Sequence, residues 1–211
     1  MKKLLVLFAL ITIHVTAFAQ SKSYTFVFLN NKPDKEVLSK EKSDSIMQGH
    51  MNNIGRLAKE GKLLAAGPFE GGGGLFVLNT TSLDEAKQWL ETDPGVKAKR
   101  WNIEMFPFTP TVNSICPVGE KFEMVFYQFV RFTNAGAPAD AIGQHNAFVQ
   151  KLNENNLVIG AGNFDNTGSG ILILKADVTK EQVEADPLIA SGKLKFEMKK
   201  LYIAKGSFCE K

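Results

Sequence analysis

Hydrophobic and polar residues follow two different periods along this chain, and the two periods succeed one another in the same order twice. Apolar side chains alternate with polar ones over 101–105 and over 194–199, as they do along a strand with one buried face. Within 46–57 and 142–152, apolar side chains instead recur three and four residues apart, which is the spacing of one face of an amphipathic helix. The chain is therefore predicted to mix strands and helices.

Other signals complete the same series of elements in each copy. Each copy opens on an aromatic-rich strand, 24–28 or 122–132, and the first helix follows it. The glycine run 71–74 lies between two short apolar strands and predicts a hairpin turn, since no Gly-Lys-Ser/Thr follows it to make a phosphate loop. A second helix then starts at a pair spaced as a capping box and ends at an Asp-Pro dipeptide. The predicted order is β-α-β-β-α-β in both copies.

The two copies align with almost constant spacing. The interval from His50 to Gly67 equals the interval from His145 to Gly162, and an Asp-Pro dipeptide follows in each copy. A repeat of this kind marks one supersecondary unit that is used more than once. We therefore predict one α/β module that occurs twice in the chain.

The element order also predicts how the modules are built and joined. It is that of a split βαβ, ferredoxin-like unit, an antiparallel sheet with both helices on one face. The other sheet face must also be covered, and two copies in one chain can cover each other. We predict an α+β protein in which the modules 20–108 and 122–211, joined by a linker at 109–121, form an intramolecular pseudo-dimer. In solution we expect a monomer or a weak homo-oligomer.

The N-terminal residues have the pattern of a secretion signal. Two lysines precede an apolar run from Leu4 to Ile11, and Ala17-Phe18-Ala19 provides a cleavage site. The run is shorter than the about 20 residues of a membrane-spanning helix, so we expect no retained membrane anchor. We predict that residues 1–19 are a signal peptide cleaved after Ala19, and that the protein is exported to the periplasm or the exterior of a bacterial cell.

The charge balance gives no reason to expect nucleic acid as a partner. The 211 residues include 25 Lys and Arg and 22 Asp and Glu, and the formal charge of +3 falls to +1 once the two lysines of the signal are removed. Binding to nucleic acid needs clusters of cations, whereas the lysines within 193–200 alternate with apolar residues as on a solvated strand.

The two cysteines of the chain are predicted to form a disulfide. An exported protein meets an oxidising compartment, where two thiols can pair. In a ferredoxin-like unit the first and last strands are adjacent and antiparallel, and Cys116 precedes the first strand of the second copy while Cys209 follows its last. A catalytic role is less favoured, because neither cysteine has a counterpart in the first copy.

Several segments of the first copy, taken together, resemble the YCII-related family. They are Gly49-His50, the segment 60–68 (EGKLLAAGP), Ala86 and the run Asp93–Val96. The resemblance covers nearly the whole first copy. It implies a module of the ferredoxin-like, dimeric α/β-barrel kind, so that the tandem would form an intramolecular pseudo-dimeric α/β barrel.

The resemblance also implies an active site made of a paired His and Asp. Carried to the matching positions, the pairs are His50 with Asp93 and, through the repeat, His145 with Asp186. The second copy departs from the family pattern at 160–163, so its pair is the less closely matched of the two. The resemblance implies no settled reaction, because a fold does not dictate a function.

Three functional hypotheses remain open from the residues. The first is an enzyme of isomerase, lyase or dehalogenase type that acts on a small organic acid or lactone, with His50 as the base and Asp93 orienting it. The second is a non-catalytic protein that binds a small organic ligand in an aromatic-lined cleft between the modules. The third is a structural role, since both histidines lie on apolar helix faces. We expect no cofactor and no metal site, because His50 and His145 lie in different modules.

Overall fold

A computed structural model describes residues 22–119 and 121–210, so the predicted signal peptide and its cleavage site lie outside the described residues. Seven elements make up the first module: β1 (Tyr24–Asn31), α1 (Lys40–Lys59), β2 (Leu63–Pro68), β3 (Gly74–Leu78), α2 (Leu83–Leu90), α3 (Pro94–Lys97) and β4 (Trp101–Val112). The second module repeats the order and adds one 3-10 turn: β5 (Met124–Asn134), η1 (Ala139–Ala141), α4 (Ile142–Glu154), β6 (Val158–Asn163), β7 (Gly170–Leu174), α5 (Lys180–Glu184), α6 (Pro187–Ala190) and β8 (Leu194–Ala204). The predicted α+β class with two ferredoxin-like modules is confirmed.

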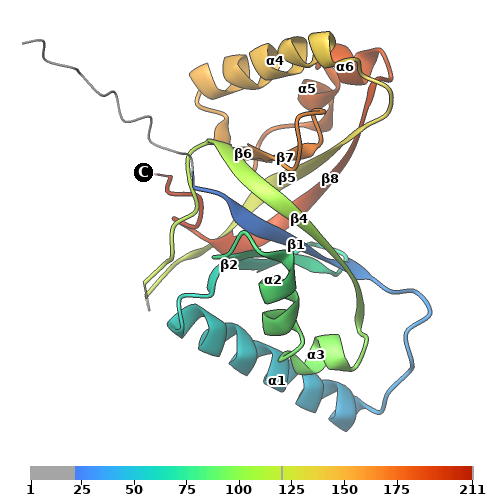
Figure 1. Ribbon diagram of the computed structural model, residues 1–211, viewed down its shortest axis with the longest axis vertical. Coiled ribbons are helices and arrows are strands. Elements are labelled where there is room, and N and C mark those ends of the chain that lie inside the picture. The colour runs from blue at the N-terminus through green and yellow to red at the C-terminus, as the bar shows by residue number, and fades with distance from the viewer. Residues whose placement is uncertain (1–21, 120, 211) are drawn as a thin grey trace, which may run out of the picture.

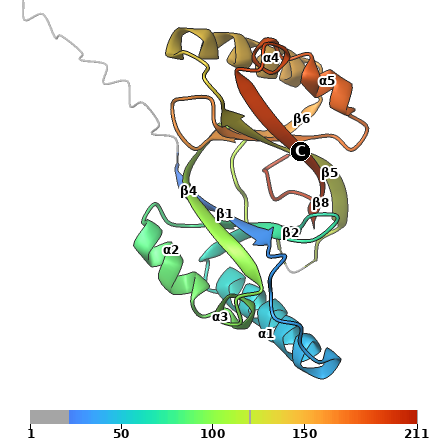
Figure 2. The same ribbon diagram turned by 90° about the vertical axis from the view of Figure 1, so that its right-hand side faces the viewer.

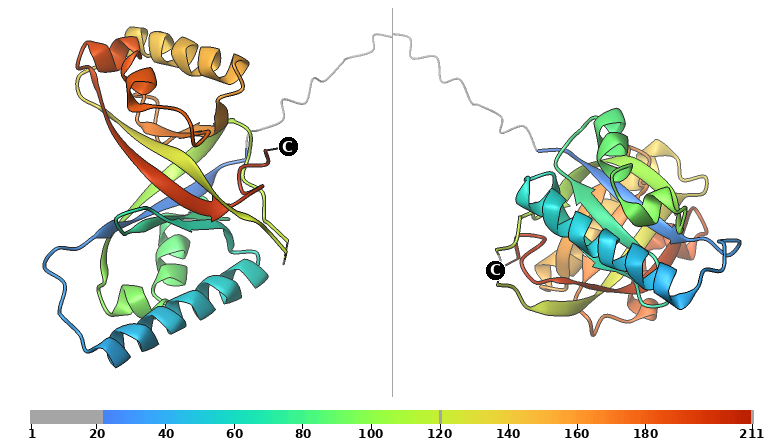
Figure 3. Two further views of the ribbon diagram at one scale, coloured as in Figure 1. Left: turned by 180° about the vertical axis from the view of Figure 1, so that it is seen from behind. Right: turned by 90° about the horizontal axis from the view of Figure 1, so that it is seen from below.

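The eight strands form one antiparallel sheet that runs across both modules. Their order is β2-β3-β1-β4-β6-β7-β5-β8. The two outer strands meet, because Phe69 pairs with Leu201 and the Glu70 N–H donates to the Lys200 carbonyl at 2.9 Å. The sheet therefore closes into a barrel, with α1–α3 outside it at one end of the molecule and α4–α6 outside it at the other (Figures 1 and 2). Figure 3 shows the same arrangement from behind and from below.

The strand β4 is longer than the sequence indicated, and this corrects one predicted boundary. Residues 109–112, which we assigned to the start of the linker, belong to β4, where Thr109 pairs with Asn163 and Pro110 pairs with Gly162 of the other module. Pro110 suggested a linker because proline cannot donate a ladder hydrogen bond. It is accommodated here beside a register shift between Pro110 and Val112, and bulges are a place where strands tolerate proline.

Two repeat-equivalent glycines lie at the two seams where strands of different modules meet. A Cβ atom on Gly67 of β2 would lie 2.6 Å from the Tyr202 carbonyl oxygen of β8. A Cβ atom on Gly162 of β6 would lie 2.4 Å from the Phe108 ring of β4. Real Cβ atoms do not approach so closely. Glycine has no Cβ atom, so a glycine at each of these positions lets the strands of the two modules pair.

Aromatic side chains from both modules fill the barrel. Phe26 and Phe28 of β1, Phe108 of β4, Phe129 of β5 and Phe164 of the second hairpin belong to one buried cluster. The aromatic residues that we expected to line a cleft between the modules therefore form a packed core. In each module a further core lies between the helices and the outer face of the sheet. A smaller cluster in the second module contains Ala141, Leu188 and Leu194.

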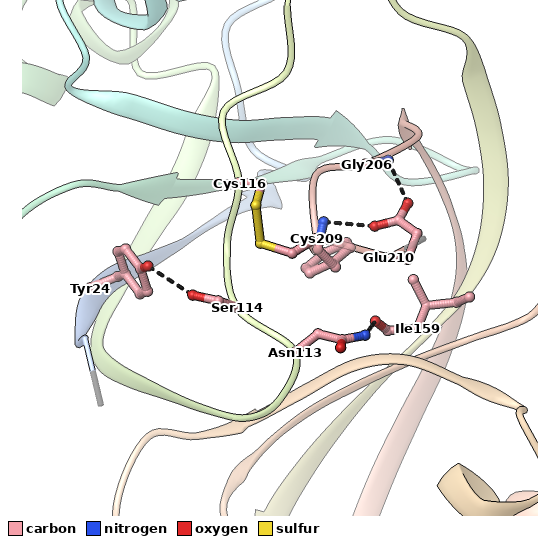
Figure 4. Close-up of a disulfide and its surroundings, with 9 residues drawn as sticks. Tyr24, Asn113, Ser114, Cys116, Ile159, Gly206, Cys209 and Glu210 are labelled. Carbon is pink, nitrogen blue, oxygen red and sulfur yellow. Dashed lines mark hydrogen bonds between the residues drawn. A yellow bond between two sulfur atoms is a disulfide. The ribbon is translucent and has the colours of Figure 1, made fainter. Parts of the chain in front are cut away.

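The predicted disulfide joins Cys116 and Cys209, whose Cα atoms are 5.1 Å apart (Figure 4). The Cys116 N–H also donates to the Ser207 carbonyl at 3.0 Å. Between these contacts, Phe208 is 1% exposed and belongs to the barrel core. The disulfide thus fastens the C-terminal segment 205–210 across one end of the barrel.

We expect the double variant Cys116→Ser, Cys209→Ser to be less stable than the parent by about 2–4 kcal/mol, because the cross-link restricts the unfolded chain over a long loop. Urea denaturation of both proteins under oxidising conditions measures this difference. Equal midpoints, or an equal response of both proteins to a reductant, would contradict the prediction.

Candidate functional site

The structure brings the four predicted site residues together as two pairs. His50 of α1 contacts Asp93, with Nδ1 2.9 Å from Oδ2, and His145 of α4 contacts Asp186 at 2.6 Å between the same atoms. Both aspartates have no exposed surface, and the histidines are 7% and 5% exposed. Each pair therefore links the first helix of its module to the segment that follows the second.

Short helices that the sequence analysis missed hold the two aspartates. We interpreted each Asp-Pro as the end of a helix, but Pro94 and Pro187 begin the further helices α3 and α6. Proline is well suited to the first turn, where its missing N–H is not needed, and aspartate is a preferred N-cap. Asp93 Oδ1 accepts from the Gly95 N–H at 2.8 Å, and Asp186 Oδ1 accepts from the Leu188 N–H at 2.8 Å. The second oxygen of each carboxyl group is left to face the histidine.

The contact with a carboxylate defines which nitrogen of each ring is free. A carboxylate only accepts, so Nδ1–H donates and Nε2 of the neutral ring carries the lone pair. Within residues 22–119 and 121–210, neither Nε2 makes a hydrogen bond and no buried side-chain nitrogen or oxygen is left unpaired. Both Nε2 atoms therefore reach the molecular surface, so each pair can accept or deliver a proton there.

A polar network that the sequence analysis missed supports the first pair. Asn53, one turn after His50 on α1, donates from Nδ2 to Asp93 Oδ2 at 3.2 Å. Its own oxygen accepts from Arg56 Nη2 at 2.8 Å and from Thr92 Oγ1 at 3.1 Å. The spacing of three residues between the histidine and Asn53 is the sequence signal that could have found this partner.

Aromatic rings cover the first histidine. The His50 ring stacks on Phe76, with 5.9 Å between centroids and 18° between planes, and its centroid is 4.8 Å from that of Trp101. The His50 ring therefore packs against the core of its module.

Asp93 is ionised more readily than an ordinary carboxyl group. Burial alone raises its pKa, but the hydrogen bond from His50, the charge of that ring, and the hydrogen bonds from the Val96 N–H and Asn53 together outweigh burial and lower the pKa. These partners are available only in the folded protein. The ionised form of Asp93 therefore contributes to folding stability.

The lowered pKa predicts a loss of stability in acid. Because the folded-state pKa of Asp93 lies below the ordinary value of 3.8, its contribution is present above that value and is lost as the pH falls through the folded-state pKa. We expect Asp93→Asn to be less stable at pH 7 and to lose less further stability than the parent between pH 5 and pH 3. Urea denaturation across this range tests the prediction, and parallel curves would contradict it.

The second pair has no counterpart of the polar network. At the repeat positions of Asn53, Arg56 and Thr92 the chain has Phe148, Lys151 and Ala185. Phe148 packs on the core beneath the helices instead of bonding the carboxyl group. The Phe132 ring, 4.8 Å from the His145 ring and edge-on to it, is the aromatic neighbour here.

A pocket of about 420 Å³ lies beside the second pair. Its walls come from α4, β5, β6, β7 and the end of β4, so both modules contribute. Polar lining side chains are His145, Asn146, Gln150, Asn153, Asn163 and Thr111. The second pair, the less closely matched one in sequence, is therefore the pair that opens onto a volume suited to a small ligand.

Residues 22–119 and 121–210 contain no group of three or more His, Cys, Asp or Glu side chains that is placed to hold a metal ion. None of their helices is long and apolar enough to cross a membrane.

Two ferredoxin-like modules that close one barrel, each with a His–Asp pair at its helices, define a tandem α+β barrel protein. Residues 24–109 match the model of the YCII-related domain, so the first module is similar to that domain. The second module has the same order of strands, the same helices and an equivalent pair.

A solved structure titled "Putative monooxygenase", from Fusobacterium nucleatum subsp. nucleatum ATCC 25586, is similar to this chain with a TM-score of 0.47 and 8% sequence identity. The match covers 88% of this chain and 94% of that chain. No curated protein matches the chain significantly.

Proposed function

We propose that this protein is an exported enzyme that transfers a proton on a small organic molecule, in a reaction of isomerase, lyase or dehalogenase type. The observation that carries the proposal is the position of His145. Its Nδ1 is held by the buried Asp186 at 2.6 Å, and His145 is one of the residues that line the pocket of about 420 Å³. Pockets for small ligands have volumes of about 300–1,000 Å³.

The roles of the two side chains follow from this arrangement. Asp186 keeps the proton on Nδ1 and stabilises the imidazolium that forms when Nε2 accepts a second proton. His145 is the group that would take a proton from a C–H beside a carbonyl and return it to another atom. The first pair, with His50 packed between Phe76 and Trp101, would serve mainly to hold α1 and α3 together.

Export is part of the same proposal. The pattern of residues 1–19 supports a cleaved signal, and the disulfide between Cys116 and Cys209 is compatible with an oxidising compartment. Secretion of the full chain in a bacterial host, followed by N-terminal sequencing of the mature protein, tests this part. A first residue other than Gln20 would place the cleavage site elsewhere, and a protein retained in the cytoplasm would overturn the assignment.

Proton transfer can be tested before the substrate is known. The protein is incubated in D₂O with a panel of small carbonyl compounds and lactones, and ¹H NMR follows the exchange of C–H protons for deuterium. We expect His145→Gln to slow the exchange of a responding compound by about 10²–10⁴-fold, the usual contribution of a general base. The exposed Lys151→Ala, on the same helix but outside the pocket lining, is the matched control and should retain the rate.

Two results would contradict the proposed function. Exchange that His145→Gln leaves unchanged would remove this ring from the chemistry, and exchange that is lost only in His50→Gln would assign the chemistry to the first module. Compounds that bind without any exchange would favour the alternative of a non-catalytic binding protein.

A further inference from the structure

We propose that the pocket beside His145 takes a neutral, hydroxyl-rich ligand of the size of a monosaccharide or its lactone. This inference rests on the proposed function, because it names the class of molecule for the same site. It narrows the expectation of a small organic acid or lactone to the uncharged, hydroxyl-bearing class.

Side-chain amides dominate the polar part of the pocket. Asn146, Gln150 and Asn153 come from successive turns of α4, and Asn163 ends β6 on the opposite wall. Within the described part of the chain, only Gln150 of these four makes a side-chain hydrogen bond, which it donates to Glu154 at 3.0 Å. Three amide groups are therefore free to bond a ligand.

Amides suit hydroxyl groups because both donate and accept. Each carboxamide offers an oxygen acceptor and two N–H donors, and each ligand hydroxyl offers one donor and two acceptor lone pairs. A ligand with several hydroxyls can pair with Asn146, Asn153 and Asn163 in either direction. The Thr111 hydroxyl adds one more group of the same kind.

No fixed charge lines the pocket. Its lining, as far as the chain is described, contains no Lys, Arg, Asp or Glu, and His145 is the one titratable side chain. A carboxylate or phosphate that leaves water needs a cation or several N–H donors to replace its hydration. An anionic ligand would therefore need a protonated His145 ring to balance its charge, but this ring must be neutral if it is to accept a proton. A neutral ligand needs no such positive charge.

The repeat shows that these amides belong to the second module alone. At the positions equivalent to Asn146, Gln150, Asn153 and Asn163, the first module has the residues Met51, Gly55, Ala58 and Pro68. The His–Asp pair is common to both copies, but the amides around it are not. Such a difference is expected if one copy has been adapted to bind a polar ligand and the other has not.

A paired panel of sugars tests the charge and the hydroxyl groups together. Glucose, galactose and mannose are each compared with the uronate of the same skeleton, which differs by a carboxylate at C6. The protein is labelled with ¹⁵N, and the side-chain NH₂ signals of Asn146, Asn153 and Asn163 are followed during titration. We expect at least one neutral sugar to shift these signals and to bind at least tenfold more tightly than its uronate. The NH₂ signal of Asn79, which bonds the Gly61 carbonyl in the first module, should not move.

Substitutions then locate the binding. Asn153→Ala should weaken the binding of that sugar about tenfold, which corresponds to about 1.4 kcal/mol. Asn52→Ala, an exposed asparagine on α1 of the other module, is the matched control and should bind as the parent does. A uronate that binds as tightly as its neutral partner, or six sugars that all leave the three signals unchanged, would overturn the proposed ligand class.

The outcome separates this inference from the proposed enzymatic activity. Binding without proton exchange in the parent protein would retain the ligand class and refute the enzyme. Proton exchange in a compound of the D₂O panel, together with no binding of neutral sugars, would retain the enzyme and refute the ligand class.

Discussion

Phe129→Ala is expected to lower the free energy of unfolding by about 3–5 kcal/mol and to destabilise both modules in one transition. Phe129 belongs to β5 of the second module and is 1% exposed, but its ring neighbours are Phe26, Phe28 and Phe69 of the first. Truncation would leave a cavity in the core that the two modules share. The modules should therefore unfold together, because neither has another cover for this face of its sheet.

The matched control lies on the same strand. Phe126 is 51% exposed and pairs with Tyr202 on the outer surface, so Phe126→Ala should cost less than about 1.5 kcal/mol. Calorimetry, with fluorescence from Trp89 and Trp101 of the first module, follows both variants. A transition of the first module that stays at the parent temperature in Phe129→Ala would contradict the account of one shared core.

Asp93→Ala is expected to cost about 3–5 kcal/mol, because it leaves buried donors without an acceptor. The Gly95 and Val96 N–H groups, the Asn53 amide and the His50 ring all bond this carboxylate. Removing it also removes the N-cap of α3. The loss should be visible as a lower midpoint in urea without a change in the steepness of the transition.

The equivalent substitution in the second module is the comparison. Asp186 accepts from the Leu188 N–H and the His145 ring, which is two hydrogen bonds fewer. At about 1 kcal/mol for each net hydrogen bond, Asp186→Ala should cost about 2 kcal/mol less than Asp93→Ala. A larger loss for Asp186→Ala would contradict the view that the first pair has the greater structural role.

Much of the fold could be predicted from the sequence because the pattern of each element occurs in both copies of the repeat. The alternation in β4 and β8 and the spacing in α1 and α4 each occur twice, so an accidental pattern in one copy is corrected by the other. The disulfide pairing followed from the adjacency of the first and last strands in this topology. The end of β4 could not be predicted in this way, because residues 109–112 form a strand only by pairing with the other module.

The two His–Asp pairs of the candidate site could be predicted from the sequence, but the side chains around them could not. A histidine on the first helix and an Asp-Pro downstream recur in both copies, and the resemblance to the YCII-related family implied that they pair as His50 with Asp93 and His145 with Asp186, as the structure shows. The pocket depends on Thr111 and Asn163 meeting α4, contacts between segments that no local pattern relates. In the sequence, the amides around His145 are only differences between the two copies. We interpreted differences of this kind as evidence that the second pair matches the family pattern less closely.

The two copies surround the same His–Asp pair with different side chains. The first surrounds its pair with Asn53, Arg56 and Thr92 and covers the ring with Trp101. The second replaces this support with a pocket. Duplication within one chain permits this, because one module can keep the barrel stable while the other changes.

The ring nitrogens of the two histidines show directly whether His145 is the base that acts on a ligand, since ¹⁵N chemical shifts distinguish a protonated nitrogen from one with a free lone pair. At a pH where both rings are neutral, we expect a proton on Nδ1 and a free lone pair on Nε2 in both His50 and His145. When a compound that responds in the D₂O panel is added, Nε2 of His145 should shift and Nε2 of His50 should not. A proton on Nε2 of His145, or a shift confined to His50, would contradict the account.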